Sequence, residues 1–205
     1  MDRYIVLDLE MCKVPPGEIR EVYDAPREII QIGAVMLDEK YNIIDHFDML
    51  VKPEYGVIDR EIYNLTGISQ EDVENAPNSE DALKMFEDWI PDDSTLVTWS
   101  ENDIIQIDDE IYFKDLSLDK LYHYIEEYID CQELFSHKMH TAKKYQLSEA
   151  LIIADIEYDE NIHNAHTDAY NTSLLFKKIQ TEEKFTLSPY FMTPDQIFDP
   201  FKTKK

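Results

Sequence analysis

Residues 4–10, YIVLDLE, combine the pattern of a buried β-strand with two acidic side chains. Side chains alternate between the faces of a strand, so Val6, Asp8 and Glu10 share one face and the intervening isoleucine and leucines share the other. Two carboxylates side by side near a core repel each other and lose hydration. This Asp-x-Glu pattern therefore indicates either an edge strand with a solvated face or a site for a cation such as Mg²⁺, which prefers oxygen ligands.

The composition describes a folded but strongly acidic chain. Its 205 residues suit one domain, or one domain with a tail, and the 43% hydrophobic content argues against wholesale disorder. The 44 acidic and 19 basic residues give a formal net charge of −25. This charge argues against long, non-specific binding to nucleic acid. It does not exclude an enzyme that acts on nucleic acid at short range, because bound divalent ions change the local sign of a site.

The cysteines and the hydropathy favour a reducing compartment. Cys12 and Cys131 show no CxxC or zinc-ligand spacing, so we expect two unpaired thiols. The N-terminus lacks a basic segment followed by a long apolar one, and no apolar run approaches the about 20 residues of a membrane span. We therefore expect a cytoplasmic protein that contacts no membrane.

The order of predicted elements indicates an α/β protein with a mixed sheet flanked by helices. Three early strands with tight connections predict an antiparallel meander, and later segments alternate between strand and helix. Residues 11–27 hold three prolines and a glycine, which predicts a loop. The strands are expected at residues 3–10, 28–37, 43–53, 94–100 and the start of 128–135, which then turns into a helix. The other helices are expected at 59–68, 69–76, 78–90, 101–113, 119–128, 147–156 and 165–179.

Two later segments add acids to the pair on the first strand. Asp103 follows the buried strand at 94–100 and begins a helix, a place where ligand sites gather in α/β sheets. Acids are also common in the first turn of any helix, and nearby acids compete for the role. These competitors are Glu101, Asp108 and Asp109.

The second segment is HNAHTDAYNT, residues 163–172. Asp168 lies in the first part of the last helix, and His163 precedes it by five positions. A histidine beside carboxylates that bind a metal can take a proton from water. His166 is the rival for that role, and spacing alone does not choose between the two.

Taken in order, these patterns resemble the DEDDh exonucleases. That superfamily includes RNase T, oligoribonuclease, the proofreading subunit of bacterial DNA polymerase and the exonucleases that trim histone mRNA. Its order is D-x-E on the first strand, an Asp after a later strand, and H-x₄-D at the start of a C-terminal helix. Supporting matches span residues 4–178, and TWS with Asp103 is most similar to the branch of the histone-mRNA exonucleases and the KapD-type bacterial proteins. The matches are EIIQIGAV (28–35), VKP (51–53), LTGIS (65–69), DVENAP (72–77) and HNAHTDAYNTSLL (163–175).

The resemblance implies a fold and an activity. The fold is ribonuclease H-like, with a mixed five-stranded sheet in an exonuclease domain at residues 1–180, followed by a tail rich in proline and aromatic residues at 181–205. The activity is hydrolysis of phosphodiester bonds at the 3′ end of single-stranded nucleic acid, with RNA preferred over DNA and 5′-mononucleotides released. The cofactors are two Mg²⁺ or Mn²⁺ ions, and His163 is the general base. The implied metal ligands are Asp8, Glu10, Asp103 and Asp168.

The resemblance also implies a pocket for the terminal nucleotide. The backbone of Met11 and Cys12 and the turn at residues 66–68 (Thr66, Gly67 and Ile68) would line it. Met11, Leu65 and Ile68 are candidates for apolar contacts, and Trp99 is either a stacking platform or part of the core. Many relatives have Thr where this chain has Met11, so these contacts are the least defined. The basic residues available to phosphate are Lys13, Arg20, Arg27, Lys138, Lys143 and Lys144.

The sequence also suits two alternative functions. The acidic surface and the tail at 181–205 also suit a regulatory or binding protein on the exonuclease fold, similar to the KapD type. A dinucleotide diesterase, similar to oligoribonuclease, is the other alternative. Because −25 is a poor charge for holding a long strand, a protein partner or a homodimer is a further prediction.

Overall fold

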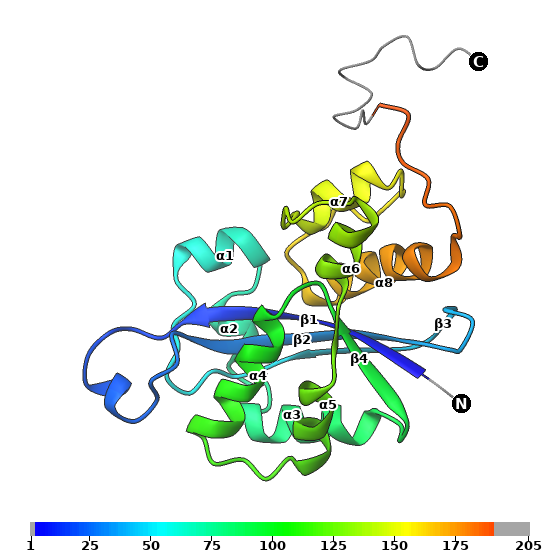
Figure 1. The fold of residues 1–205 in the computed structure, drawn as a ribbon. Coiled ribbons are helices and arrows are strands. Elements are labelled where there is room, and N and C mark those ends of the chain that lie inside the picture. Colours follow the sequence, from blue (N-terminus) through cyan, green and yellow to red (C-terminus); the bar gives the residue numbers. More distant parts are fainter. Residues whose placement is uncertain (1–2, 191–205) are drawn as a thin grey trace, which may run out of the picture.

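The computed structural model describes residues 3–190 and contains a five-stranded mixed sheet, as predicted (Figure 1). The strand order is β3-β2-β1-β4-β5. The pairs β1/β2 and β2/β3 are antiparallel, and the pairs β1/β4 and β4/β5 are parallel. The strands are β1 (Arg3–Lys13), β2 (Arg27–Leu37), β3 (Ile43–Leu50), β4 (Ser94–Thr98) and β5 (Ile129–Asp130).

Helices cover both faces of this sheet. In Figure 1, α3, α4 and α5 lie on one side, and α1, α6, α7 and α8 lie on the other. The helices are α1 (Arg60–Thr66), α2 (Gln70–Val73), α3 (Ser79–Trp89), α4 (Asn102–Phe113), α5 (Asp119–Glu126), α6 (Cys131–Lys138), α7 (Leu147–Ile153) and α8 (Ala165–Thr181). Each lies where its sequence pattern predicts a helix.

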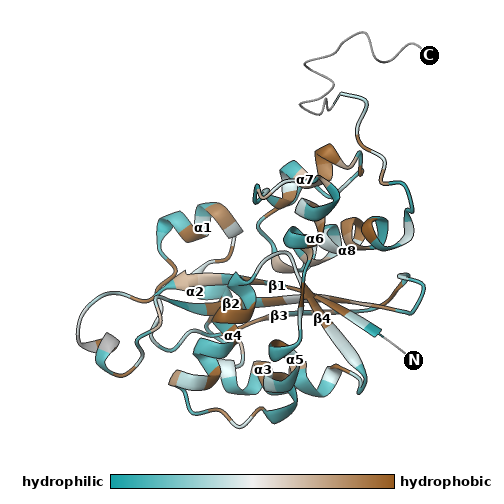
Figure 2. Ribbon diagram, in the orientation of Figure 1, coloured by the Kyte–Doolittle hydropathy of each residue, from teal (hydrophilic) through white to brown (hydrophobic). Residues whose placement is uncertain are grey.

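The alternation along β1 divides the core into two layers. Ile5, Leu7 and Leu9 belong to the cluster that includes Phe86 of α3. Val6 belongs to the opposite cluster, with residues of α6, α7 and α8. Figure 2 shows hydrophobic stretches along the strands, while the helices alternate between hydrophilic and hydrophobic residues. Burial of these two apolar faces supplies the main driving force for this arrangement.

The loop predicted at 11–27 is shorter in the structure. Residues 11–13 continue β1, because they pair with residues 27–29 of β2 after a register shift between Glu10 and Met11. A 3-10 helix, Glu18–Glu21, lies within the remaining loop. Tyr23 is fully buried and stacks on Tyr55, so the loop carries its own small core, which the proline content did not predict.

The chain beyond α8 returns to the domain. Phe185 packs against Phe135 with ring centroids 6.0 Å apart, and the Ser188 N–H donates to the Ile153 carbonyl oxygen at 2.8 Å. The domain boundary at 180 stays a prediction, and most of the predicted tail, residues 191–205, lies outside the described residues. No helix within residues 3–190 is long and apolar enough to span a membrane.

Candidate active site

The two acids on β1 occupy a gap between the helices that cover this face of the sheet. Before them, Val6 packs under α8 and its neighbours. After them, Cys12 is fully buried with Ile62 of α1. Asp8 and Glu10 lie between these two covered segments, and Glu10 is only 9% exposed. The arrangement excludes the reading of β1 as a solvated edge strand, because β1 also lies between β2 and β4.

Asp103 reaches the same place from the start of α4. The ladder between β1 and β4 ends at Leu7 and Thr98, which leaves the next N–H of β1 on that side to find another partner. The Leu9 N–H donates to Asp103 Oδ1 at 3.1 Å. Asp103 is 6% exposed, and this bond holds its carboxylate against β1.

Asp168 and His163 come from the start of α8. The N-cap is Asn164, whose side chain accepts a hydrogen bond from the Thr167 N–H. The His163 N–H donates to Asp168 Oδ2 at 3.0 Å, with His163 at a φ of +63°. Glu10, His163 and Asp168 can each present one ligand atom within 4.8 Å of the others. The short H-x₄-D segment therefore folds back on itself beside β1.

Two residues of β2 fix the position of α8, and neither was singled out from the sequence. A Cβ on Gly33 would lie 2.1 Å from the His166 backbone nitrogen and 2.2 Å from the Ala165 carbonyl carbon, so only glycine admits this helix start. Gln31 Oε1 accepts from the Ala165 N–H at 3.1 Å. A glycine inside a strand often marks close approach of another backbone, and Gly33 carried that signal.

Gly33→Ala should displace the start of α8 and with it Asp168. We expect a loss of about 1–3 kcal/mol in the free energy of unfolding, as for an overpacked core. Mn²⁺ affinity should fall in the same variant, and calorimetric titration together with urea unfolding would measure both. Ala34→Gly is the matched control, because Ala34 belongs to the opposite core layer and changes by the same methyl group. Equal Mn²⁺ affinity in the two variants would contradict this role of Gly33.

The four carboxyl groups disfavour their charged forms. Burial raises the pKa of Asp8 well above its usual range, and repulsion from Asp103, Asp168 and Glu10 raises it further. Burial and the charges of Asp168 and Asp103 raise the pKa of Glu10 to about 8. Burial raises the pKa of Asp103 to about 7 and also raises that of Asp168. Converging carboxylates that disfavour charge are suited to a hard divalent cation, which prefers this donor set.

His166, the rival histidine, is turned away from this cluster. Its Nε2 lies 3.0 Å from His46 Nδ1 on β3, at hydrogen-bond distance. The ring is therefore engaged with the edge strand, although its backbone is only two residues from Asp168. Of the two histidines, His163 is therefore the one that lies beside Glu10 and Asp168.

The residues predicted to line the nucleotide pocket, other than Trp99, belong to the end of β1 and to α1 and the turn after it. Gly67 ends α1 with a φ of +75°, and Thr66 Oγ1 accepts from the Ile68 N–H at 3.1 Å, so the turn is rigidly built. Leu65 is 48% exposed, whereas the side chains of Ile68 and Cys12 are buried in one core cluster. Leu65 is thus the freest apolar candidate, and Cys12 is confined to backbone contacts. Met11 is partly buried against the opposite core layer.

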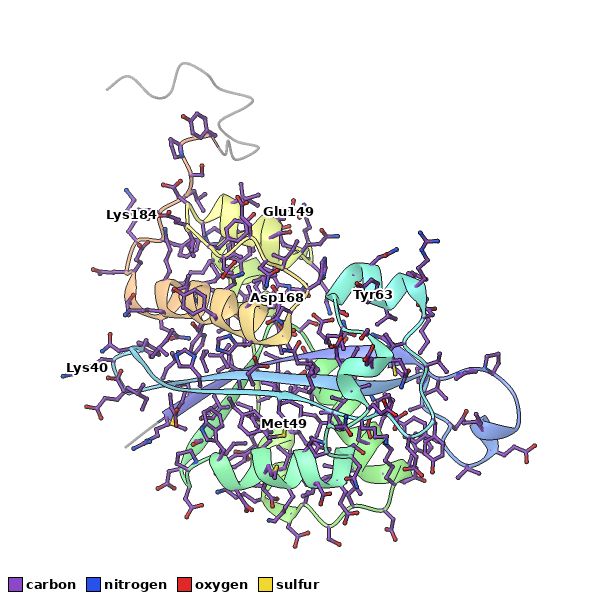
Figure 3. The ribbon with its side chains drawn as sticks, turned by 180° about the vertical axis from the view of Figure 1, so that it is seen from behind. Lys40, Met49, Tyr63, Glu149, Asp168 and Lys184 are labelled. Carbon is purple, nitrogen blue, oxygen red and sulfur yellow. The ribbon has the colours of Figure 1, made fainter. Side chains whose placement is uncertain are left out.

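A cavity of about 550 Å³ opens on the other side of the carboxylates. Asp168 and His163 form part of its wall. The rest comes from residues 99–102, α6, α7 and the segments before α7 and before His163. Trp99 also lines this cavity, yet it is only 8% exposed and packs against Phe135 in the core. Figure 3 shows Asp168 on the face of the sheet that also carries Tyr63 of α1 and Glu149 of α7. The sequence did not reveal this cavity, because its walls come from distant segments.

Residues 5–176 match the model of the exonuclease family. The chain belongs to this family. It is 27% identical over 198 residues to the PolC-type DNA polymerase III of Bacillus cereus, covering 97% of this chain but 12% of that polymerase. This chain therefore spans about an eighth of the length of that relative.

Solved structures share the fold of this family member. The nuclease domain of 3′hExo, a DEDDh family member bound to rAMP, has a TM-score of 0.69 and 19% identity, covering 93% of this chain and 98% of that one. A 3′-exonuclease that recognises the histone mRNA stem-loop has a TM-score of 0.73 and 19% identity, covering 91% of this chain and 66% of that one. The predicted exonuclease fold with a mixed five-stranded sheet is confirmed.

Proposed function

We propose that this protein is a metal-dependent 3′→5′ exonuclease that hydrolyses single-stranded nucleic acid from its 3′ end and releases 5′-mononucleotides. The observation that carries the proposal is the convergence of four carboxylates and His163 in the gap between α1 and α8. RNA is the preferred substrate in this proposal. This preference is supported by the likeness to two solved structures, one of a 3′-exonuclease that recognises the histone mRNA stem-loop and one of a nuclease domain bound to rAMP.

The donor set of the site supports two divalent ions, Mg²⁺ or Mn²⁺. When bound, they supply charge neutralisation for the phosphate and for the groups that react around it. Removal of the ions should destabilise the site, because the acidic side chains would then repel each other. The proposed ligands are Asp8, Glu10, Asp103 and Asp168.

The protein's own groups position the water and accept its proton. The hydrogen bond from the His163 N–H to Asp168 Oδ2 holds the backbone of His163 in place, so that its ring can lie beside Glu10. In the proposed reaction the water oxygen forms a bond to phosphorus and the bond to the leaving 3′-oxygen breaks. The water proton passes to an imidazole nitrogen of His163, and the 3′-oxygen takes a proton from solvent.

The α1 side of the gap is the proposed place of the terminal nucleotide. The residues proposed to contact it are Leu65, which is exposed at the end of α1, and the turn at Thr66 and Gly67. Arg27 is exposed, and its positive charge opposes the rise in the pKa of Asp103. It is therefore the basic residue proposed to approach the terminal phosphate. A homodimer or a protein partner stays a prediction.

Matched RNA and DNA oligomers with labelled 5′ ends test this function. With Mg²⁺ or Mn²⁺ we expect a ladder of products shortened from the 3′ end, 5′-mononucleotides by mass analysis, and no turnover in EDTA. RNA should be degraded faster than DNA of the same sequence. Absence of turnover by intact, folded protein, or release of fragments from the 5′ end, would contradict the proposal.

A further inference from the structure

The cavity beside Asp168 carries one strong positive charge. Lys144 is the only lysine or arginine among the described residues that line it. Its side chain is 69% exposed, so its ammonium group reaches solvent at the cavity while it is paired with the Glu101 carboxylate. The same cavity has Asp168 and His163 in its wall, which places Lys144 in one enclosure with the proposed reaction centre.

Apart from Lys144, Asp168 and His163, the wall combines uncharged polar side chains with apolar ones, such as Leu147 and Ile162. Ser100, Asn102 and Ser148 contribute hydroxyl and amide groups. Gln132 ties the wall together, because its N–H donates to the Trp99 carbonyl oxygen at 2.8 Å and its side-chain amide donates to the Tyr145 carbonyl oxygen at 2.7 Å. A volume of about 550 Å³ lies within the range of small-ligand sites, so one nucleotide fits its scale.

Beyond Lys144 the surface becomes acidic. A second cavity, of about 400 Å³, shares Gln132 and Lys144 with the first and adds Glu101, Asp130 and Glu133. Lys144 Nζ lies 3.6 Å from Glu101 Oε1. The cationic group thus marks a border between the reaction centre and a negatively charged surface, which repels a phosphate placed farther out.

We propose that Lys144 binds the first phosphate on the 5′ side of the scissile one, and that the acids beyond it penalise longer strands. This inference rests on the proposed function. If the terminal nucleotide occupies the α1 side and the scissile phosphate lies at the carboxylates, the penultimate nucleotide falls in the cavity. Its 5′-phosphate then faces Lys144, and the next phosphates face Glu101 and Glu133.

Dinucleotides with and without a 5′-phosphate test the assignment. The 5′-phosphorylated dimer carries the phosphate that Lys144 would bind, and the unphosphorylated dimer lacks it, while the scissile bond is the same. The measured quantity is kcat/KM for the 5′-phosphorylated dimer divided by kcat/KM for the unphosphorylated dimer. Lys144→Ala should lower this ratio by about 10-fold or more, the effect of losing one charged hydrogen bond. Glu101→Gln should raise it, because it frees the ammonium group of Lys144.

Lys143→Ala is the matched control. It removes the same charge from the adjacent position, but Lys143 lies over the Tyr145 ring at 4.4 Å and pairs with Glu149 at 2.5 Å. The control should keep the wild-type ratio. An unchanged ratio in Lys144→Ala, or an equal fall in both lysine variants, overturns the assignment. Absence of turnover on both dimers and on longer RNA by the wild-type protein would instead count against the proposed function.

Discussion

Replacing Glu10 with Gln should lower kcat by about 10³-fold or more while making the metal-free protein more stable. A bound divalent ion contributes several kcal/mol to the stabilisation of charge in such reactions, and about 1.4 kcal/mol corresponds to a tenfold rate. Gln keeps the shape of Glu10 but removes the charge that an ion needs. Single-turnover assays on labelled RNA with saturating Mn²⁺ would measure the loss.

The gain in stability follows from the raised pKa of Glu10, which moves from 4.5 to about 8 in the folded protein. A carboxyl group whose pKa is higher in the folded state binds more protons there, so stability falls as pH rises between the two values. Glu10→Gln should therefore raise the free energy of unfolding by about 1–3 kcal/mol near about pH 8 in EDTA. Near about pH 5 most of this difference should vanish, because Glu10 is then protonated in the folded state.

Urea unfolding at the two pH values, with EDTA and with Mn²⁺, separates these effects. Mn²⁺ should stabilise the wild type more than the variant, because only the wild type keeps the full set of carboxylates. Glu39→Gln, an exposed acid in the β2–β3 turn, is the control and should change neither activity nor stability measurably. A loss of stability in Glu10→Gln at the higher pH would show that its charge is compensated within the protein.

The acids of β1 were predictable because alternation along a strand is visible in the sequence. Asp8 and Glu10 had to share a face, and a mixed sheet flanked by helices left that face near a core. Asp103 was harder to choose, because Glu101, Asp108 and Asp109 also lie on or near the same helix. The bond that singles out Asp103 joins it to Leu9, 94 residues earlier, and no local pattern reports such a distance.

The surroundings of the acids depended on tertiary contacts in the same way. Gly33 was part of a recognised strand, but its role depends on α8 passing directly over it. Lys143 and Lys144 formed one basic stretch in the sequence. Only the fold distinguishes them, because Lys143 lies over the ring of Tyr145 whereas Lys144 lines the cavity. The spacing of apolar residues along one element predicts which of them are buried. Prediction of the site also requires knowledge of which distant segments come into contact.

The two histidines provide the most direct test of the mechanism. His163→Ala should lower kcat by about 10²–10⁴-fold, the usual cost of losing a general base, with little change in KM. His166→Ala should retain most of the activity, because its ring is engaged with His46 on β3. Steady-state kinetics on RNA oligomers would compare the two variants. A large loss in His166→Ala with little loss in His163→Ala would reverse the assignment.

The position of His163 also allows a different role, which the same variant separates. Its ring can present a nitrogen within 4.8 Å of ligand atoms of Glu10 and Asp168, a distance that suits a metal ligand as well as a base. A base leaves Mn²⁺ affinity nearly unchanged when it is removed, and added imidazole should restore part of the rate. If His163 is a metal ligand, its removal lowers Mn²⁺ affinity instead, and added imidazole restores none of the rate at saturating metal. We expect the first pattern, because the four carboxylates already supply the oxygen ligands that Mg²⁺ and Mn²⁺ prefer.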